Sequence, residues 1–311
     1  MSEDGAIRAG FAAIIGAPNA GKSTLVNQLV GSKVAIVTHK AQTTRMPLRG
    51  ILMEGETQIV LIDTPGIFAP RRKLDQAMVE AAWHGAGEAD AVLWLVDAAR
   101  LAEKPDRPPT EDEDVMRALK GLSAVKGAVL LALNKIDAMP RPPLLNLAQS
   151  LSAARSFAGV FMISAKTGDG LTELRAALAR FMPESPWLYP PDQAADIPLR
   201  LLAAEITREQ LYLRLHDELP YATAVETEAY EDRKDGSTRI EQTILVERES
   251  QRPIVLGKGG ATIKAIGQAA RKELEALLER RVHLFLHVKQ RARWAEEPSR
   301  FRDMGLEFPK G

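Results

Sequence analysis

The chain has no cysteine among its 311 residues, so it forms no disulfide bond and offers no thiolate ligand to a metal. No run approaches the roughly 18 uncharged apolar residues that a membrane-spanning helix needs. The N-terminal MSEDGAIRAG has two acids and no apolar stretch, unlike a signal peptide. We therefore expect a cytoplasmic protein without disulfide partners.

The chain also lacks a net charge, because 41 Lys and Arg residues balance 41 Asp and Glu residues. The whole-chain charge is therefore uninformative about a polyanionic partner. Local charge differs: residues 248–293 carry eleven basic and four acidic residues, net +7, whereas residues 198–246 carry a net charge of −4. Basic charge is thus concentrated in one C-terminal segment.

The chain is longer than the roughly 100–200 residues of a typical domain, so we expect two domains. Up to Phe181, short apolar runs alternate with amphipathic helical patterns. This predicts an α/β domain with a mainly parallel sheet and helices on both faces. Ligands of such sheets bind beyond the carboxyl ends of the strands. The apolar runs end at Gly16, Asp63, Asp97, Asn134 and Ser164.

A domain boundary is expected after Phe181, because five prolines lie between Pro183 and Pro198. Proline removes backbone donors and disfavours helix in the residue before it, which indicates a semi-rigid linker. The predicted parts are residues 1–182, a linker over 183–198, and residues 199–311. In the last part we expect a helix over 199–218, strands over 223–230 and 237–246, a helix after Gly260 and a strand over 281–289.

The segment GAPNAGKS, from Gly16 to Ser23, matches the phosphate-loop pattern GxxxxGK[ST] between a predicted strand and a predicted helix. Its glycines let backbone N–H groups converge on phosphates at the positive end of the helix. Lys22 adds a cation, and Ser23 offers its hydroxyl to Mg²⁺. The residues expected to bind nucleotide here are Gly16, Asn19, Ala20, Gly21, Lys22, Ser23 and Thr24.

Three further motifs follow predicted strands, in the order typical of a GTP-hydrolysing protein. In DTPG, Asp63 is expected to hold Mg²⁺ and the Gly66 amide to sense the γ-phosphate. In NKID, which comprises Asn134, Lys135, Ile136 and Asp137, the aspartate accepts two hydrogen bonds from a guanine edge that adenine lacks. In SAK, which comprises Ser164, Ala165 and Lys166, the Ala165 amide is expected near guanine O6. A metabolic kinase would share the phosphate loop but would not need NKID.

The segment KAQTTR, from Lys40 to Arg45, resembles the first switch of translation-factor-related GTPases. By that resemblance Thr44 binds Mg²⁺ in the GTP state, with Thr43 as the alternative. Ile67 follows DTPG where a Ras-like GTPase carries the glutamine that orients water, and its side chain cannot do that. The chain thus resembles GTPases in which a phosphate-loop asparagine, here Asn19, binds K⁺ beside the phosphates. The alternative is a loop-stabilising amide.

The only GxxG in the chain is GKGG, residues 257–260, between apolar PIVL and a helical pattern. The surrounding order of elements resembles the α+β type II KH domain, whose GxxG loop clamps four single-stranded nucleotides. The glycines permit close backbone approach, and the lysine neutralises phosphate. Ile254, Val255, Ile263 and Ile266 line a groove for bases or form ordinary core. The predicted RNA contacts are Arg252, Ile254, Gly257, Lys258, Gly259, Gly260 and Lys264, with Arg271 and Lys272 as additional charges.

The chain closely resembles the Era family over nearly its whole length. The resemblance rests on a GTPase domain that a proline-rich linker joins to a KH domain with the segments VERESQ, residues 246–251, and GKGG. The resemblance implies Mg²⁺-dependent GTP hydrolysis. It also implies binding of the GTP form near the 3′ end of small-subunit ribosomal RNA in the pre-30S particle. Era-like proteins associate peripherally with the inner face of the cytoplasmic membrane, although no clear segment for this is present. We expect a monomer. The alternatives are a regulatory GTPase whose C-terminal domain binds protein or membrane, and an RNA-binding protein whose nucleotide is only structural.

Overall fold

The computed structural model describes residues 6–38, 40, 43–104 and 106–309. These residues fall into two compact units. The first contains the described residues within Met1–Ala35, Thr44–Asp196 and Phe301–Gly311, and the second those within Ile36–Thr43 and Ile197–Arg300. Among the described residues, no helix combines the length and apolarity needed to cross a bilayer.

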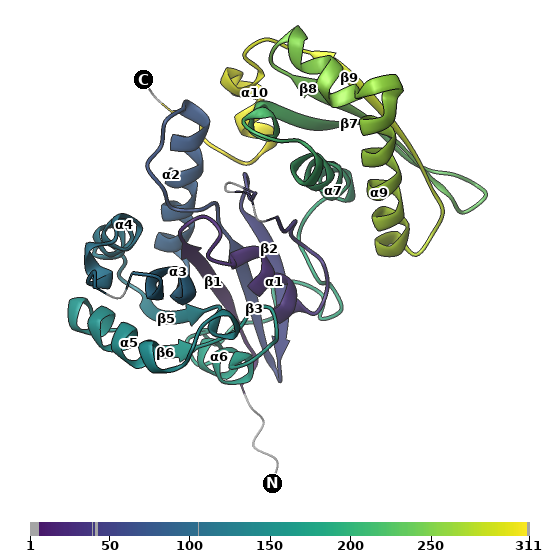
Figure 1. Ribbon diagram of the computed structural model, residues 1–311. Coiled ribbons are helices and arrows are strands. Elements are labelled where there is room, and N and C mark those ends of the chain that lie inside the picture. The colour runs from purple at the N-terminus through teal and green to yellow at the C-terminus, as the bar shows by residue number, and fades with distance from the viewer. Residues whose placement is uncertain (1–5, 39, 41–42, 105, 310–311) are drawn as a thin grey trace. The chain divides into compact units, whose positions relative to one another are not determined.

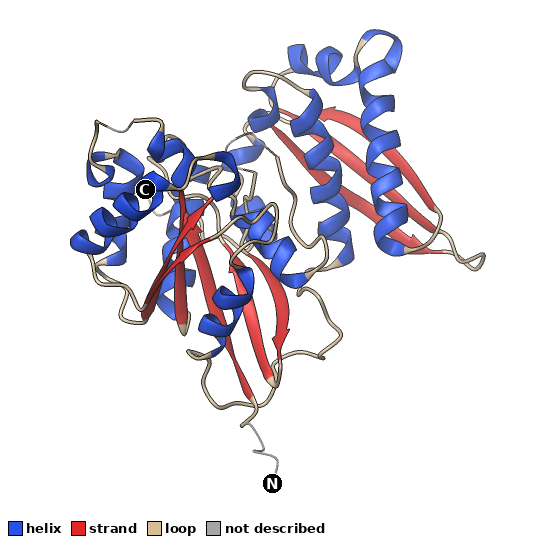
Figure 2. Ribbon diagram, turned by 60° about the horizontal axis from the view of Figure 1, so that its bottom comes forward, coloured by secondary structure: helices blue, strands red, loops and turns tan. Residues whose placement is uncertain are grey.

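A six-stranded sheet in the order β2-β3-β1-β4-β5-β6 forms the centre of the first unit (Figures 1 and 2). Only β2 is antiparallel, and it pairs with β3. The carboxyl ends of the parallel strands therefore meet at one edge, where the predicted motifs begin. The strands are β1 Arg8–Gly16, β2 Leu48–Glu54, β3 Thr57–Asp63, β4 Ala91–Asp97, β5 Ala128–Asn134 and β6 Gly159–Met162.

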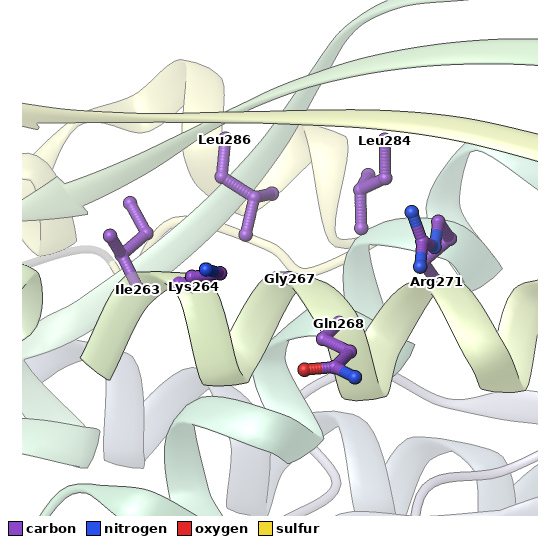
Figure 3. Close-up of a pocket in the computed structure, with 7 residues that line it drawn as sticks. All are labelled: Ile263, Lys264, Gly267, Gln268, Arg271, Leu284 and Leu286. Atoms are coloured by element: carbon purple, nitrogen blue, oxygen red, sulfur yellow. The ribbon is translucent and has the colours of Figure 1, made fainter. Parts of the chain in front are cut away.

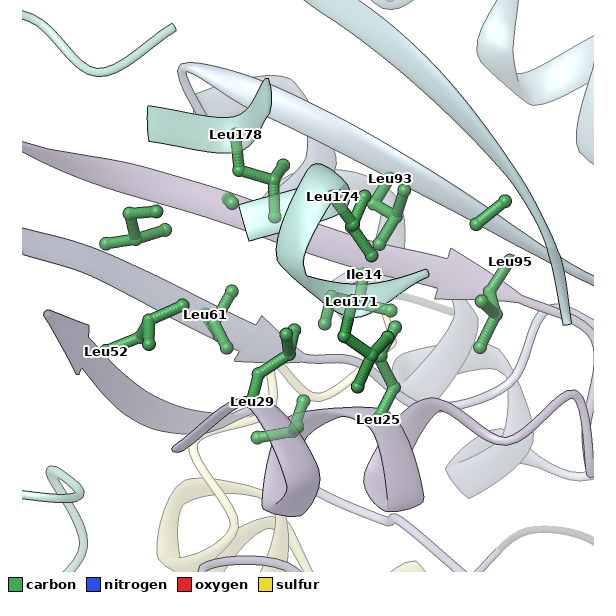
Figure 4. Packing of buried hydrophobic residues seen from close by; sticks show 14 of the residues in the cluster. Ile14, Leu25, Leu29, Leu52, Leu61, Leu93, Leu95, Leu171, Leu174 and Leu178 are labelled. Carbon is green, nitrogen blue, oxygen red and sulfur yellow. The ribbon is translucent and has the colours of Figure 1, made fainter. Parts of the chain in front are cut away.

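Helices cover both faces of this sheet because alternate strand residues point to opposite sides. Ile14 packs on one face with Leu25 of α1 and Leu171 of α6, as Figure 4 shows. Ile15 belongs to the opposite core, which α2 to α5 cover. The helices are α1 Lys22–Val30, α2 Lys73–Glu88, α3 Ala98–Ala102, α4 Glu113–Leu122, α5 Pro142–Ala154 and α6 Leu171–Ala179.

The second unit has a three-stranded sheet in the order β7-β8-β9, with β7–β8 antiparallel and β8–β9 parallel. Helices α7 and α9 pack on it through two apolar cores, which contain Ile206, Ile244 and Ile266. The expected order of elements is therefore present. The elements are α7 Leu199–Arg214, β7 Thr223–Asp232, β8 Thr238–Val246, α8 Arg252–Leu256, α9 Ala261–Leu278 and β9 Val282–Gln290, followed by α10 Pro298–Asp303.

The proline-rich segment lies along the first unit instead of forming a separate spacer. Ile51 N donates to Ala194 O at 2.8 Å, and the Gln58 side chain accepts from Leu188 N at 2.8 Å. The first bond satisfies a backbone donor of the edge strand β2, and the second satisfies a backbone donor of the proline-rich segment. Among the described residues, those within 36–43 group with the second unit and those within 301–311 group with the first.

Candidate nucleotide and RNA sites

The phosphate loop curls around the Lys22 ammonium, which donates to Gly16 O at 3.2 Å and Ala17 O at 3.1 Å. Burial lowers the pKa of Lys22 to about 8, although the nearby Asp63 carboxylate opposes that shift. A buried cation held mainly by carbonyl dipoles is suited to receive an anion. Gly21 has a φ of 98°, and a Cβ there would lie 2.4 Å from Asn134 Nδ2, so this position requires glycine.

Three side-chain oxygens gather beside the loop, as the magnesium prediction requires. Ser23 Oγ donates to Asp63 Oδ2 at 2.7 Å and lies 2.9 Å from Thr44 Oγ1, which itself donates to Asp63 Oδ2 at 3.2 Å. Burial raises the pKa of Asp63. Its other oxygen, Oδ1, is buried and has no hydrogen-bond partner among the described residues. An orphaned carboxylate oxygen beside two hydroxyls fits Mg²⁺, which prefers oxygen ligands and bound water.

The two switch threonines occupy different surroundings. Thr43 Oγ1 lies 2.8 Å from Thr38 Oγ1 and donates to Lys40 O at 2.9 Å, whereas Thr44 lies in the oxygen cluster. Sequence left the choice between these neighbours open. The geometry favours Thr44.

The segment that contains DTPG and Ile67 contacts the phosphate loop through its backbone. Ile67 N donates to Gly16 O at 2.9 Å, and a Cβ on Gly66 would lie 2.9 Å from Pro18 N. The Ile67 side chain is buried in the core on the Ile15 face. It therefore cannot orient a water at the phosphates. Asn19, the predicted K⁺ ligand, has a left-handed φ of 62° within the loop.

Asn134 braces the predicted base pocket instead of facing it. Its Nδ2 donates to Ala20 O at 2.8 Å, and its Oδ1 accepts from Ala165 N at 2.9 Å. The Ala165 amide, expected near guanine O6, is thus engaged by Asn134 in this structure. Ser164 Oγ donates to Asp137 Oδ1 at 2.6 Å, which fixes the carboxylate that is predicted to read guanine.

Sequence reasoning missed Asn27 in the middle of α1. Its Oδ1 accepts from Val34 N and Ala35 N, each at 2.9 Å, and its Nδ2 donates to Ala35 O at 2.7 Å. These bonds fix the chain just before the first switch. Asparagine inside a helix is a weak hint, because it favours caps and turns over helix interiors.

The GKGG loop depends on left-handed backbone at all three of its glycines. Gly257, Gly259 and Gly260 have φ values of 75°, 60° and 79°. A Cβ on Gly257 would lie 2.2 Å from Thr262 Oγ1, whereas nothing lies within 4 Å of one on Gly259 or Gly260. The last two glycines thus face open space, as approach by a nucleic-acid backbone requires. Lys258 is exposed beside them.

A groove of about 490 Å³ lies between α9 and β9, beyond the loop (Figure 3). Two leucines of β9 form its apolar wall, while α9 supplies polar and basic groups. Val255 and Ile266 are fully buried and form ordinary core, whereas Ile254 is 58% exposed. The groove is lined by Ile263, Lys264, Gly267, Gln268, Arg271, Leu284 and Leu286.

Comparison with known proteins identifies both units. Residues 11–135 match a family described as 50S ribosome-binding GTPase, and residues 218–295 match the KH domain family. GTPase Era of Caulobacter vibrioides is 61% identical over 306 residues, which is 97% of each chain. GTPase Era of Maricaulis maris is 58% identical over 308 residues, which is 97% of this chain and 98% of that one.

Two Era crystal structures are similar along nearly the whole chain. One shows Aquifex aeolicus Era bound to GDP·AlF4⁻, and the other shows Era in complex with MgGDPNP and nucleotides 1506–1542 of 16S ribosomal RNA. Each is 36% identical with a TM-score of 0.88, over 96% of this chain and 99% of its own. The expected fold, a phosphate-loop GTPase domain followed by a KH domain, is confirmed. The chain belongs to the Era family of GTPases.

Proposed function

We propose that this protein is a GTP-hydrolysing switch that binds small-subunit ribosomal RNA near its 3′ end and assists maturation of that subunit. The observation that carries the proposal is the pairing of the Ser23, Thr44 and Asp63 oxygen cluster with an open, left-handed GKGG loop in one chain. The Era complex with 16S ribosomal RNA supports the same RNA as the partner.

In the nucleotide site, the chain supplies charge and fixed donors. Lys22 is desolvated and would bind phosphate oxygens in place of the loop carbonyls that it now contacts. Ser23, Thr44 and Asp63 would hold Mg²⁺, which neutralises charge on the β- and γ-phosphates. Asp137 would accept from the guanine edge. Because Ile67 cannot orient water, we propose that K⁺ at Asn19 supplements these charges.

In the RNA site, the backbone makes the closest approach. Gly259 and Gly260 leave space for phosphates, and Lys258 would neutralise one of them. Bases splayed from a single strand would enter the groove between α9 and β9. Lys264 and Arg271 on the same helix would add favourable charge. The basic segment over residues 248–293 therefore serves one polyanion.

The second unit also holds part of the first switch, which supports communication between nucleotide and RNA. Val37 N donates to Glu209 Oε1 of α7 at 2.8 Å. The buried Arg208 guanidinium, also on α7, donates to the Thr43 carbonyl. Thr43 immediately precedes the predicted magnesium ligand Thr44. A change in the metal contact of Thr44 would therefore alter the position of Thr43 and its bond to Arg208.

Thermodynamic linkage tests this function. We would measure the affinity for an RNA matching the 3′ end of 16S ribosomal RNA, with GDP and with a non-hydrolysable GTP analogue. The GTP form should bind RNA more tightly, and RNA should tighten GTP binding by the same factor. Equal RNA affinities in both nucleotide states would refute the switch. Absence of RNA binding in both would favour a regulatory GTPase with a protein or membrane partner.

Action on the ribosome would place the protein in the cytoplasm. Association with the inner face of the cytoplasmic membrane and a monomeric state stay predictions. Flotation with anionic vesicles and sedimentation would test them.

A further inference from the structure

One ion pair at the nucleotide edge of the sheet joins the NKID motif to a residue that lies outside every motif read from the sequence. Lys135 of NKID places its Nζ 2.6 Å from Asp97 Oδ2. Strands β4 and β5 end side by side, with Asp97 and Asn134 in register. The residue that follows Asn134 therefore emerges next to the Asp97 carboxylate, so the sheet itself makes this contact available.

Both partners are restrained by their own backbone conformation or by a further hydrogen bond. Lys135 has a left-handed φ of 68°, which is uncommon for a residue with a side chain. Asp97 uses its second oxygen, Oδ1, to accept from Arg100 N at 3.1 Å and so caps α3. The Asp97 side chain is only 12% exposed and that of Lys135 is 35% exposed. The pair is thus partly shielded from water.

The other nearby cation, the Arg100 guanidinium, makes no hydrogen bond to Asp97 among the described contacts. The Arg100 guanidinium forms two bonds of 2.9 Å with the Asp112 carboxylate instead. Lys135 is therefore the cation that contacts Asp97. The charge-assisted bond of 2.6 Å restricts the end of the lysine side chain.

We propose that Asp97 is a positioning residue for the guanine pocket. In the sequence, Lys135 lies between Asn134, which braces the predicted base pocket, and Asp137, which is predicted to read guanine. On this proposal, its four-carbon stem borders that pocket. Asp97 holds the tip of that stem and makes it a fixed wall against the face of the base. A free lysine would lose side-chain entropy when nucleotide binds, and Asp97 removes most of that cost in advance. This inference rests on the proposed function.

The variant Asp97→Asn separates positioning from folding, because asparagine also caps helices well but cannot pair its charge with Lys135. Dissociation of fluorescent GDP and IDP from the full-length protein is the measurement. We expect GDP and IDP to dissociate from Asp97→Asn about threefold to tenfold faster than from the wild type. The factor should be the same for both nucleotides, because the lysine stem would contact the face of the ring and not the 2-amino group in which they differ. Thermal unfolding without nucleotide should not change. Asp97→Glu should restore part of the lost residence time.

A double-mutant cycle with Lys135→Met decides the mechanism. In that background Asp97→Asn should have no further effect on nucleotide dissociation. A full additional effect, an effect on GDP but not IDP, or an unchanged dissociation rate in the single variant would overturn the inference. Asp137→Asn serves as the reference. If it loses GDP while Asp97→Asn does not, only this inference fails; if it retains GDP, the proposed guanine site fails.

Discussion

Gly259 offers the sharpest test of the RNA site, through the pair Gly259→Asp and Gly259→Asn. Its φ of 60° is a conformation that Asp and Asn tolerate better than other residues with side chains. A Cβ there has no other atom within 4 Å. Both variants should therefore fold and bind nucleotide normally. They have nearly the same shape and differ in charge.

The charge difference sets the expected magnitude. An aspartate about 5 Å from an RNA phosphate is repelled by about 1 kcal/mol at the dielectric constant of water and about 3 kcal/mol at an effective value of 20. These energies correspond to about a 5- to 150-fold weaker RNA affinity for Gly259→Asp than for Gly259→Asn. Because the loop is exposed, we expect the lower part of this range at physiological salt.

Fluorescence anisotropy with a labelled RNA from the 3′ end of 16S ribosomal RNA measures both variants. The difference in RNA affinity between the two variants should decrease as the salt concentration increases, since the repulsion is electrostatic. If both variants lose RNA affinity equally, the size of the new side chain and not its charge would be what prevents binding. Wild-type affinity in Gly259→Asp would refute the close approach of this loop to phosphate, whatever else the second unit binds.

Three predictions concern the nucleotide site. Asp137→Asn should weaken GTP binding by about ten- to hundredfold and shift preference toward XTP, because unmet buried hydrogen bonds cost about 1–3 kcal/mol; an unchanged GTP-to-XTP ratio in titrations would contradict this. Potassium should accelerate hydrolysis over sodium at matched ionic strength, and Asn19→Ala should abolish the difference; equal rates would leave Asn19 a structural amide. Thr44→Ala should slow Mg²⁺-dependent turnover at least about tenfold, the loss of one charge-assisted ligand, whereas Thr43→Ala should have a smaller effect. A larger loss of turnover in Thr43→Ala than in Thr44→Ala would identify Thr43 as the metal ligand.

The local motifs were readable because their chemistry lies in a few consecutive residues. GAPNAGKS needs its own glycines, lysine and serine at fixed spacing, and GKGG needs left-handed backbone that glycine adopts freely. Continuous apolar runs likewise identified the parallel strands. The predicted run ending at Ser164 extends beyond β6, which ends at Met162, because Ser164 already begins the turn toward Asp137.

Strand β2 was not predicted. It carries Arg49 and Gly50 in its first half and pairs antiparallel with β3 at the sheet edge. Its strand character depends on that partner more than on its own sequence, as strand propensity commonly does. The edge position of β2 also explains why the proline-rich segment lies along it.

The sequence by itself determined the family, the order of the motifs and the nature of both ligands, since each rests on neighbouring residues. The tertiary structure decided which side chains meet across the chain. It separated Thr44 from Thr43, turned Asn134 toward Ala20 and Ala165, and set Lys135 on Asp97. These contacts join residues 19 to 114 positions apart. Only the folding of parallel strands into one sheet brings them within bonding distance, and no local pattern records that.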